Sequence, residues 1–298
     1  MRQFLNQIGL FLILLLGVFL VLEAPVQINY DTQISAVADW QCLDSINADI
    51  LVVGNSRVES GFNPIAIEKA TGYEAFLLTQ TGWQAPLLKK KLENYMLVNE
   101  PPIWLVIQAD PIHLNTRSDW YAKSQFLKYL FLDRENLQET VRPYKGYRWF
   151  EFVVPFIRYQ GVPGRYVRDA LGIPMELDKM KGYKPNKGRN RHEPIPFDSC
   201  KIELESLKIL EDFYELSPTS IKMGVYPLVS PELYDRTMGV TNIERFCADH
   251  GIQFINANEL IKHKPDSIYS NHTHANIYGA MMQTQLLTDR ITHALQLP

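Results

Sequence analysis

The stretch VVGNSRVESGF, residues 52–62, decides the fold class. Residues 50–53 (Ile-Leu-Val-Val) form an uninterrupted apolar run, which is typical of a strand buried on both faces. The polar tetrapeptide Gly-Asn-Ser-Arg follows at once at 54–57 and predicts a turn. In open α/β sheets, ligands bind beyond the carboxyl ends of the strands. The stretch therefore predicts a parallel sheet with Ser56 at its functional edge.

Further apolar runs recur along the chain, and segments with helical periodicity separate them. We expect the other strands at 75–78, 103–109, 221–226 and 252–255. We expect helices at 63–70, 84–98, 201–214, 242–250 and 277–296. This alternation predicts an α/β fold: a three-layer α/β/α, doubly wound, mostly parallel five-stranded sheet of flavodoxin-like type over residues 48–298.

The alternation breaks at about 111–199, which we interpret as an insertion or lid within the same domain. Its stretch 144–168 is aromatic and basic, and two interpretations stay open. It binds saccharide through ring stacking, or it packs on the core and lies against the membrane. We expect the basic loop 181–192 to be a solvated, mobile face.

The N-terminus carries a second strong signal, because residues 8–22 contain no charged or strongly polar side chain. With the residues before it, this run approaches the length of a transmembrane helix. No small-residue cleavage pattern follows, so we expect an uncleaved signal anchor at 1–23 and a connector at 24–47. Arg2 precedes the run and Glu23 and Asp31 follow it, which predicts a single-pass membrane protein with its bulk outside the cytoplasm.

Composition excludes some classes of function. The formal net charge of −3 gives no overall attraction to nucleic acid. The three cysteines are far apart and none has zinc-site spacing. A metal pair at His272 and His274 lacks a third ligand nearby. We expect no metal and no cofactor.

A second polar stretch, SNHTHANIYGA at 270–280, lies just before the final helix. Its loop follows the last strand, so His272 and His274 are expected at the same sheet edge as Ser56. A serine becomes a competent nucleophile when a base takes its proton and a third group orients the base. Asn271 and Asp266 are candidates for that third group, although each has a competing reading as a turn residue.

Together these two stretches resemble the SGNH (GDSL-like) hydrolase family. Gly54-Asn55-Ser56 resembles its Gly-Asp-Ser turn, and His274 to Gly279 resembles its His-x-Asn-x-x-Gly motif. The resemblance covers roughly 48–296 apart from the insertion. It implies that Ser56 is the nucleophile and His274 the general base. It further implies oxyanion donors at the backbone N–H groups of Ser56 and Gly82.

Two positions depart from the family. Asn271 stands where the resemblance leads us to expect an aspartate, and it orients an imidazole without supplying charge. Gln108-Ala109-Asp110 stands in place of Gly-x-Asn. Asp110 would repel an oxyanion unless it is protonated or turned away, whereas Gln108 would supply an amide if the register shifts. Arg57 either meets an anionic substrate or pairs with Asp110.

The membrane-anchored layout resembles the branch of the family that serves cell-envelope O-acylation. The first hypothesis is an extracytoplasmic serine esterase or O-acyltransferase that acts on an acylated glycan or envelope polymer, with a membrane acyltransferase as a possible partner. The second is a catalytically inactive SGNH-fold protein that binds such a polymer or a membrane-protein partner.

Overall fold

In a computed structural model, the described part of the chain comprises 2–31, 46–114, 139–144, 147–149, 164, 167, 170–171, 180–188, 200–202, 204–262 and 265–295. The chain divides into two compact units. One comprises Met1–Leu43 with Ser118–Met175, and the other comprises Asp44–Arg117 with Glu176–Pro298. The predicted site residues all belong to the second unit. Most of the predicted insertion, including nearly all of 144–168, lies outside the described residues.

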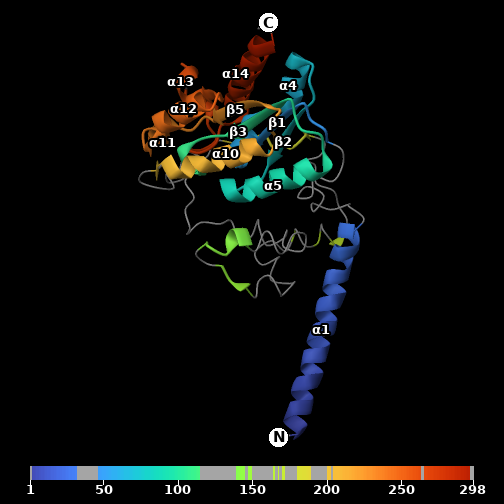
Figure 1. The fold of residues 1–298 in the computed structure, drawn as a ribbon. Helices are drawn as coiled ribbons and strands as arrows, with labels where there is room; N and C mark the ends of the chain where they lie inside the picture. The colour runs from blue at the N-terminus through green and yellow to red at the C-terminus, as the bar shows by residue number, and fades with distance from the viewer. Residues whose placement is uncertain are drawn as a thin grey trace. The chain divides into compact units, whose positions relative to one another are not determined.

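The second unit is built on a five-stranded parallel sheet, which confirms the predicted α/β class (Figure 1). Its strands are β1 (Ile50–Gly54), β2 (Ala75–Thr79), β3 (Trp104–Gln108), β5 (Ile221–Tyr226) and β7 (Gln253–Asn256). Their order is β2-β1-β3-β5-β7, and every neighbouring pair is parallel. The order reverses direction at β1, and this reversal is the place where ligands bind in doubly wound sheets.

Helices cover both faces of the sheet, as the alternation of elements predicted (Figure 1). On one face lie α3 (Ser56–Gly61), α4 (Pro64–Thr71) and α14 (Ile277–Leu295). On the other lie α5 (Ala85–Val98) and α10 (Lys208–Glu215), while α12 (Val240–Asp249) packs beside β7. Shorter helical elements of this unit are α6 (Pro111–Leu114), η5 (Leu204–Leu207), α11 (Pro231–Tyr234), α13 (Ala257–Leu260) and η6 (Asp266–Ile268).

Alternate strand residues divide between the two faces because side chains on a strand alternate in direction. Ile50 and Val52 of β1 pack in one core cluster with Leu287 and Ile291 of α14. Leu51 and Val53 are equally buried and face the α5 side. Burial of both faces explains why the strands read as continuous apolar runs.

The segment before α10 differs from the prediction. A helix was expected from 201, but Cys200–Lys201 forms a short strand, β4, that pairs in parallel with β6 (Thr237–Met238). The 3₁₀ turn η5 then leads into α10. The apolar spacing of 204–213 was read correctly as helical, but a two-residue strand leaves no periodic pattern to detect.

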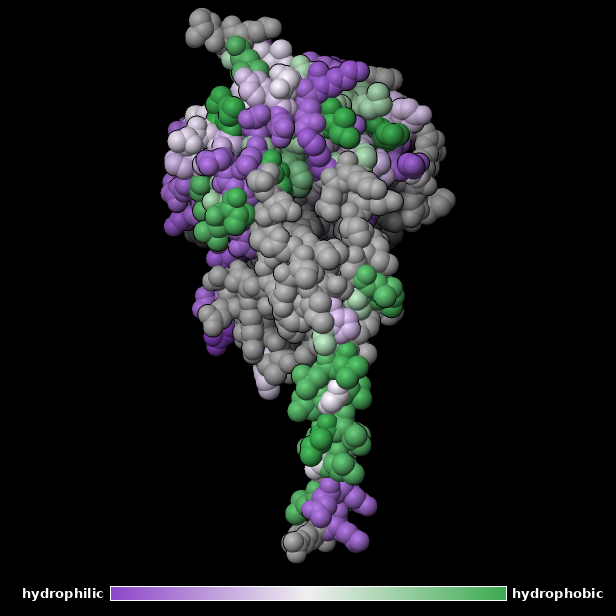
Figure 2. All heavy atoms as spheres, turned by 90° about the vertical axis from the view of Figure 1, so that its right-hand side faces the viewer, coloured by the Kyte–Doolittle hydropathy of each residue, from purple (hydrophilic) through white to green (hydrophobic). Residues whose placement is uncertain are grey.

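In the other unit, residues Arg2–Asp31 form one helix, α1. Apolar side chains are exposed along much of it, as the green stretch of α1 shows in Figure 2. Within the described ranges, no helix combines the length and the apolarity required to span a bilayer.

Candidate active site

Ser56 lies where β1 ends and α3 begins. Asn55 is the N-cap of α3, and its side-chain oxygen accepts a hydrogen bond from the backbone N–H of Arg57. The sequence predicted a turn here, but the helix begins at Ser56 itself because Asn55 satisfies its first turn. Asparagine is among the residues that favour the N-cap position, so Asn55 was a usable signal for it.

Gly54 allows this turn to sit tightly against β3. A Cβ at this position would overlap the side chain of Val58 and lie 2.5 Å from Gln108 Oε1. The same Gln108 oxygen accepts a hydrogen bond from the backbone N–H of Asn55 at 2.8 Å. Because residue 54 is a glycine, the backbone next to Ser56 can lie close enough to β3 to bond to Gln108.

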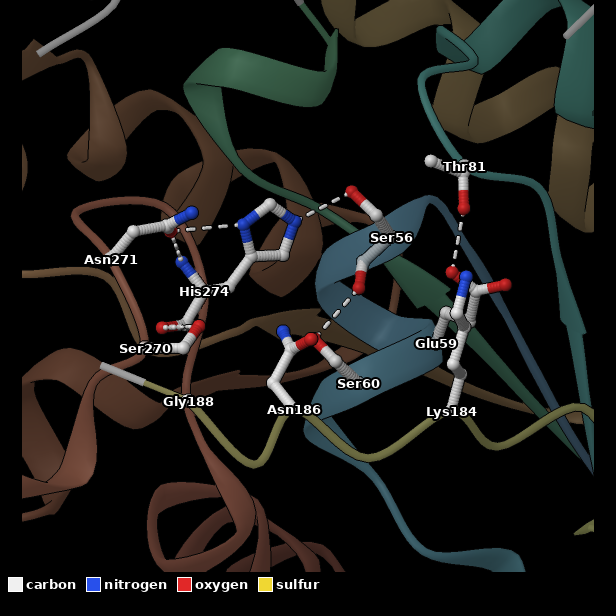
Figure 3. Close-up of a pocket in the computed structure, with 10 residues that line it drawn as sticks. All are labelled: Ser56, Glu59, Ser60, Thr81, Lys184, Asn186, Gly188, Ser270, Asn271 and His274. Carbon is white, nitrogen blue, oxygen red and sulfur yellow. Dashed lines mark hydrogen bonds between the residues drawn. The ribbon is translucent and has the colours of Figure 1, made fainter. Parts of the chain in front are cut away.

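The structure brings Ser56 and His274 together. His274 Nε2 lies 2.7 Å from Ser56 Oγ, although the loop 270–276 and α3 come from opposite ends of the domain. Figure 3 shows the imidazole between Ser56 on one side and Asn271 on the other. This is the spacing that a general base requires to take a proton from a serine hydroxyl.

Asn271 fixes both the backbone and the ring of His274. Its Oδ1 accepts hydrogen bonds from the backbone N–H groups of Thr273 at 3.0 Å and His274 at 2.9 Å. Because an amide oxygen only accepts, its 3.0 Å contact with His274 Nδ1 places the ring proton on Nδ1. In that tautomer, Nε2 is free to accept the proton of Ser56.

Thr273 is a functional candidate that the sequence reading missed. Its hydroxyl donates to Asn271 Oδ1 at 3.0 Å, and its oxygen lies 2.7 Å from His274 Nδ1. The Nδ1 proton is therefore shared between the amide oxygen and the threonine hydroxyl. The sequence offered no signal for this role, since a threonine in a polar loop has many possible partners.

The electrostatics of the base differ from those of a charged triad. Burial lowers the pKa of His274 to about 4, and the positive charge of Arg57 lowers it further in the same direction. Among the described residues, no carboxylate raises this pKa in return. His274 is therefore neutral at neutral pH and available as a base, but the imidazolium formed during catalysis gains no charge stabilisation from Asn271.

Asp110 lies under the site and does not line the cavity around Ser56. It is fully buried, and its Oδ1 lies 2.9 Å from Arg57 Nη2. The backbone N–H groups of Ile112 and His113 also donate to Oδ1, and Gln108 Nε2 donates to Oδ2. Its negative charge is thus balanced by Arg57 within the protein, and the carboxylate is not part of the described lining of the cavity.

These contacts decide between the open readings of Arg57 and Gln108. Arg57 pairs with Asp110, and its guanidinium is 4% exposed, so it does not reach out to a substrate. Gln108 is fully buried and uses its amide to link Asn55 with Asp110. Within the described residues, neither side chain lines the cavity at Ser56.

His113, which the sequence reading did not single out, completes this buried group. Its Nδ1 lies 3.4 Å from Asn55 Nδ2, and its Nε2 has no hydrogen-bond partner among the described residues. Burial lowers its pKa to about 4. His113 therefore packs as a neutral side chain beneath the serine turn.

The proposed oxyanion donors lie in two turns. The Ser56 N–H makes no hydrogen bond with any described residue. Gly82 lies in the turn after β2 with a φ of 75°, next to Thr81, which lines the cavity. Gly82 itself is not among the cavity's lining residues.

A cavity of about 370 Å³ opens at Ser56. Figure 3 shows α3, the loop after Thr79, the loop before α14 and a segment around 184–188 surrounding it. Polar side chains dominate its lining: Ser56, Glu59, Ser60, Thr81, Lys184, Asn186, Gly188, Ser270, Asn271 and His274. Glu59 is nearly buried and accepts a 2.6 Å hydrogen bond from Thr81 Oγ1.

The segment 180–188 corrects one sequence expectation. The basic loop 181–192 was predicted to be solvated and mobile, but backbone hydrogen bonds attach 181–186 to three elements. Lys181 O accepts from Leu77 of β2, Lys184 N donates to Glu59 of α3, and Asn186 O accepts from Ile277 of α14. We call 180–188 the strap; it forms one wall of the cavity. Residues 189–192 lie outside the described ranges.

Two further candidates lie apart from Ser56. Asp266 is exposed at the start of η6 and makes no hydrogen bond to His274, so Asn271 holds the orienting position. His272 points to a different partner, with its Nδ1 2.9 Å from Ser230 Oγ. Within the described residues, no three metal-ligating side chains converge as a metal site.

Comparisons with known proteins add little to this geometry. No family model matches the chain, and no curated protein matches it. Among solved structures, one similar protein is from Streptococcus pneumonia and is provisionally described as a platelet activating factor. It has 13% identity and a TM-score of 0.43, and the match covers 95% of this chain and 99% of that one. Another is an acetyl xylan esterase from Butyrivibrio proteoclasticus, with 12% identity, a TM-score of 0.35 and coverage of 83% and 63%. Likenesses this weak establish neither a family nor an activity.

Proposed function

We propose that this chain is an SGNH-type serine esterase or O-acyltransferase that acts on acyl esters of a glycan or other envelope polymer. One observation carries the proposal: the hydrogen-bonded series from Ser56 Oγ through His274 to Asn271 Oδ1. A serine, a base and an orienting group in this order are the parts that acyl transfer needs.

The reaction follows from that arrangement. Ser56 Oγ attacks the ester carbonyl carbon while His274 Nε2 takes its proton, which gives a tetrahedral oxyanion. The Ser56 N–H supports that oxygen, with the Gly82 N–H as the proposed second donor. When the carbon–oxygen bond to the alcohol breaks, His274 returns the proton to the leaving oxygen. Water or an acceptor hydroxyl then attacks the acyl-serine by the same steps.

The cavity lining supports a polyhydroxylated substrate. Serine, threonine and asparagine side chains exchange hydrogen bonds readily with sugar hydroxyls. The exposed Lys184 and nearly buried Glu59 give the wall one charge of each sign. The lining therefore favours a polar polymer over a long acyl chain.

A catalytically inactive binding protein is the second candidate. The amide of Asn271 favours it, because replacing the orienting aspartate by asparagine costs about 10⁴ in kcat in the serine proteases. Asp110 does not favour the inactive protein, because its carboxylate is paired with Arg57 and is not part of the described cavity lining. The two candidates differ in a single measurable property, turnover at Ser56.

Hydrolysis of a chromogenic short-chain ester and of an acetylated glycan tests the proposal. Ser56→Ala and His274→Ala are each expected to lose at least about 100-fold in kcat/KM. Ser267→Ala and His293→Ala are matched controls, because their side chains line no described cavity, and they are expected to keep wild-type rates. Equal rates in all five proteins would remove the catalytic assignment.

The membrane anchor is a separate proposal. It is supported by the uncharged run 8–22 and by the exposed apolar side chains along α1. We expect the full chain to remain in the membrane fraction after alkaline extraction, and to be released when Leu14 and Leu15 are both replaced by arginine. Retention of that double variant would contradict the anchor. The same membrane-anchored layout is the basis for proposing a membrane acyltransferase as a partner.

A further inference from the structure

A nearly buried carboxylate lies one helical turn beyond the nucleophile. Glu59 follows Ser56 by three positions on α3, so the two side chains lie on the same face of the helix, with about 5–6 Å between their Cβ atoms. Glu59 is 8% exposed, and it lines the cavity that opens at Ser56. A substrate whose ester lies at Ser56 therefore brings its neighbouring atoms close to this carboxylate.

The two oxygens of this carboxylate differ in their contacts. Thr81 Oγ1 donates to Glu59 Oε2 at 2.6 Å, as the dashed line in Figure 3 shows. Glu59 Oε1 makes no hydrogen bond with any described residue, and it keeps accessible surface, unlike the fully buried orphan atoms of the core. A carboxylate oxygen can only accept, and acceptors on nearly buried side chains normally have a donor. Oε1 therefore lacks a donor that a molecule in the cavity can supply.

Contacts from three parts of the fold keep this acceptor in place. The backbone of Glu59 belongs to α3, and its carbonyl oxygen accepts a hydrogen bond from the backbone N–H of Lys184 in the strap at 2.8 Å. Thr81, which orients the carboxylate, lies in the turn after β2. Glu59 is thus a preorganised acceptor and not a mobile surface charge, so little ordering is required when a donor binds.

The polar groups around Glu59 suit a hydroxyl better than a cation. Lys184 lines the same cavity and adds a positive charge, which disfavours a second cation. Thr81 gives its only hydroxyl proton to Glu59, so its oxygen can only accept from another molecule. A hydroxyl both donates and accepts, so it can donate to Glu59 and accept from a donor such as Lys184.

We propose that Glu59 determines substrate specificity by accepting, at Oε1, a hydrogen bond from a free hydroxyl next to the acylated oxygen. The inference rests on the proposed function, because that function places the ester at Ser56. It narrows the substrate class to partially acylated polyols, in which an unmodified hydroxyl neighbours the ester. Thr81 is a positioning residue for this contact.

A matched pair of esters tests the contact. 2-Hydroxyethyl acetate carries the required donor, whereas 2-fluoroethyl acetate is of similar size and cannot donate. The measured quantity is the ratio of kcat/KM for the hydroxyl ester to kcat/KM for the fluoro ester. This ratio is expected to be at least about tenfold higher in the wild type than in Glu59→Leu, because a site built to bond a hydroxyl rejects the analogue without it. Equal ratios in the two proteins would overturn the proposal.

The ratio compares two esters on one protein, so a general loss of active enzyme cancels. Glu59→Gln keeps an acceptor without the charge and is expected to give an intermediate ratio. Thr81→Val should lower the ratio and Thr81→Ser should restore it, whereas an unchanged ratio in Thr81→Val would overturn the positioning role. Glu211→Gln is the control and should keep the wild-type ratio, because Glu211 is exposed on α10 and does not line the cavity.

Binding to the full-length Ser56→Ala protein separates this inference from the proposed function, because it requires no turnover. In an NMR titration, 2-hydroxyethyl acetate is expected to bind more tightly than 2-fluoroethyl acetate, and the preference should disappear when Glu59→Leu is added. That result, without hydrolysis of either ester by the wild type, would uphold the contact and reject the esterase. Hydrolysis of both esters by the wild type, with the same ratio in Glu59→Leu, would uphold the esterase and reject the contact.

Discussion

The Nε2 atom of His274 lies 2.7 Å from Ser56 Oγ, although 218 positions separate the two residues in the chain. The parallel sheet makes this possible, since the loop after β1 and the loop before α14 reach the same edge. The contact gives the chain a nucleophile and a base, while the orienting group is an amide. The predictions below follow from that combination and from the buried group beneath it.

Asn271→Asp is expected to increase kcat by at least about tenfold, because a carboxylate stabilises the imidazolium that forms when His274 takes the proton. The added negative charge also raises the pKa of His274 above its present value of about 4. In the wild type, kcat/KM should rise through about pH 4 and stay level to neutrality, since neutral His274 is the active base. In Asn271→Asp, the acid limb should move to higher pH.

Asn271→Ala serves as the opposing variant, because it removes the orienting oxygen without adding charge. A pH–rate series on the three proteins checks the prediction. An acid limb at the same pH in the wild type and Asn271→Asp would show that His274 is not the titrating base.

Asp110→Asn is expected to lower the free energy of unfolding by about 3–5 kcal/mol, because it leaves the buried Arg57 guanidinium without a counter-charge. The double variant Arg57→Met, Asp110→Asn should recover part of the loss, since it removes both charges. Urea unfolding at neutral pH measures both values. A loss below about 1 kcal/mol in Asp110→Asn would contradict the buried ion pair.

His113 makes stability depend on pH. Its pKa is about 4 in the folded chain and about 6.5 when unfolded, so below pH 6.5 the unfolded chain binds a proton that the folded chain does not. The contribution of His113 to the free energy of unfolding is therefore complete above pH 6.5, and it decreases as the pH falls from 6.5 toward 4. Between pH 6.5 and 5, the wild type should lose about 1.5 kcal/mol more than His113→Gln. Parallel losses in the two proteins would contradict the burial of a neutral His113.

Gly182→Ala tests the strap as a wall of the cavity. Gly182 has a φ of 83°, and a Cβ there would overlap the backbone carbonyl of Leu77. The variant should detach the strap from β2 and raise KM for an acetylated glycan by about tenfold, with little change in kcat for a small ester. Gly251→Ala is the matched control, because Gly251 also has a positive φ, of 65°, a Cβ there meets no atom within 4 Å, and it lines no described cavity. Equal effects of the two substitutions would contradict the role of the strap.

The sequence was most informative where burial imposes a pattern. The strands appear as apolar runs because the sheet is covered on both faces, and parallel topology then places Ser56 and His274 at one edge. Contacts between side chains from different elements could not be predicted from the sequence in this way. The charge on Asp110 looked adverse to an oxyanion, because only the fold reveals that Arg57 neutralises it.

The strap is a second place where the sequence did not reveal tertiary contacts. Its lysines, its glycines and Asn186 give it the composition of a solvated loop. The backbone hydrogen bonds that attach it to β2, α3 and α14 depend on no particular side chain. Thr273 and His113 were also missed, since their roles arise from neighbours distant in sequence or from the fold of a short loop. The helix at Ser56 was missed as well, although Asn55 is a residue type that favours the N-cap position.

Covalent labelling of Ser56 tests the central claim most directly. A serine-directed fluorophosphonate is incubated with the folded full-length protein, and mass spectrometry locates the modified residue. The activated pair predicts one label per chain, on Ser56, with labelling lost in His274→Ala and accelerated in Asn271→Asp. An unlabelled Ser56 in folded wild-type protein, or a rate unchanged in His274→Ala, would contradict it.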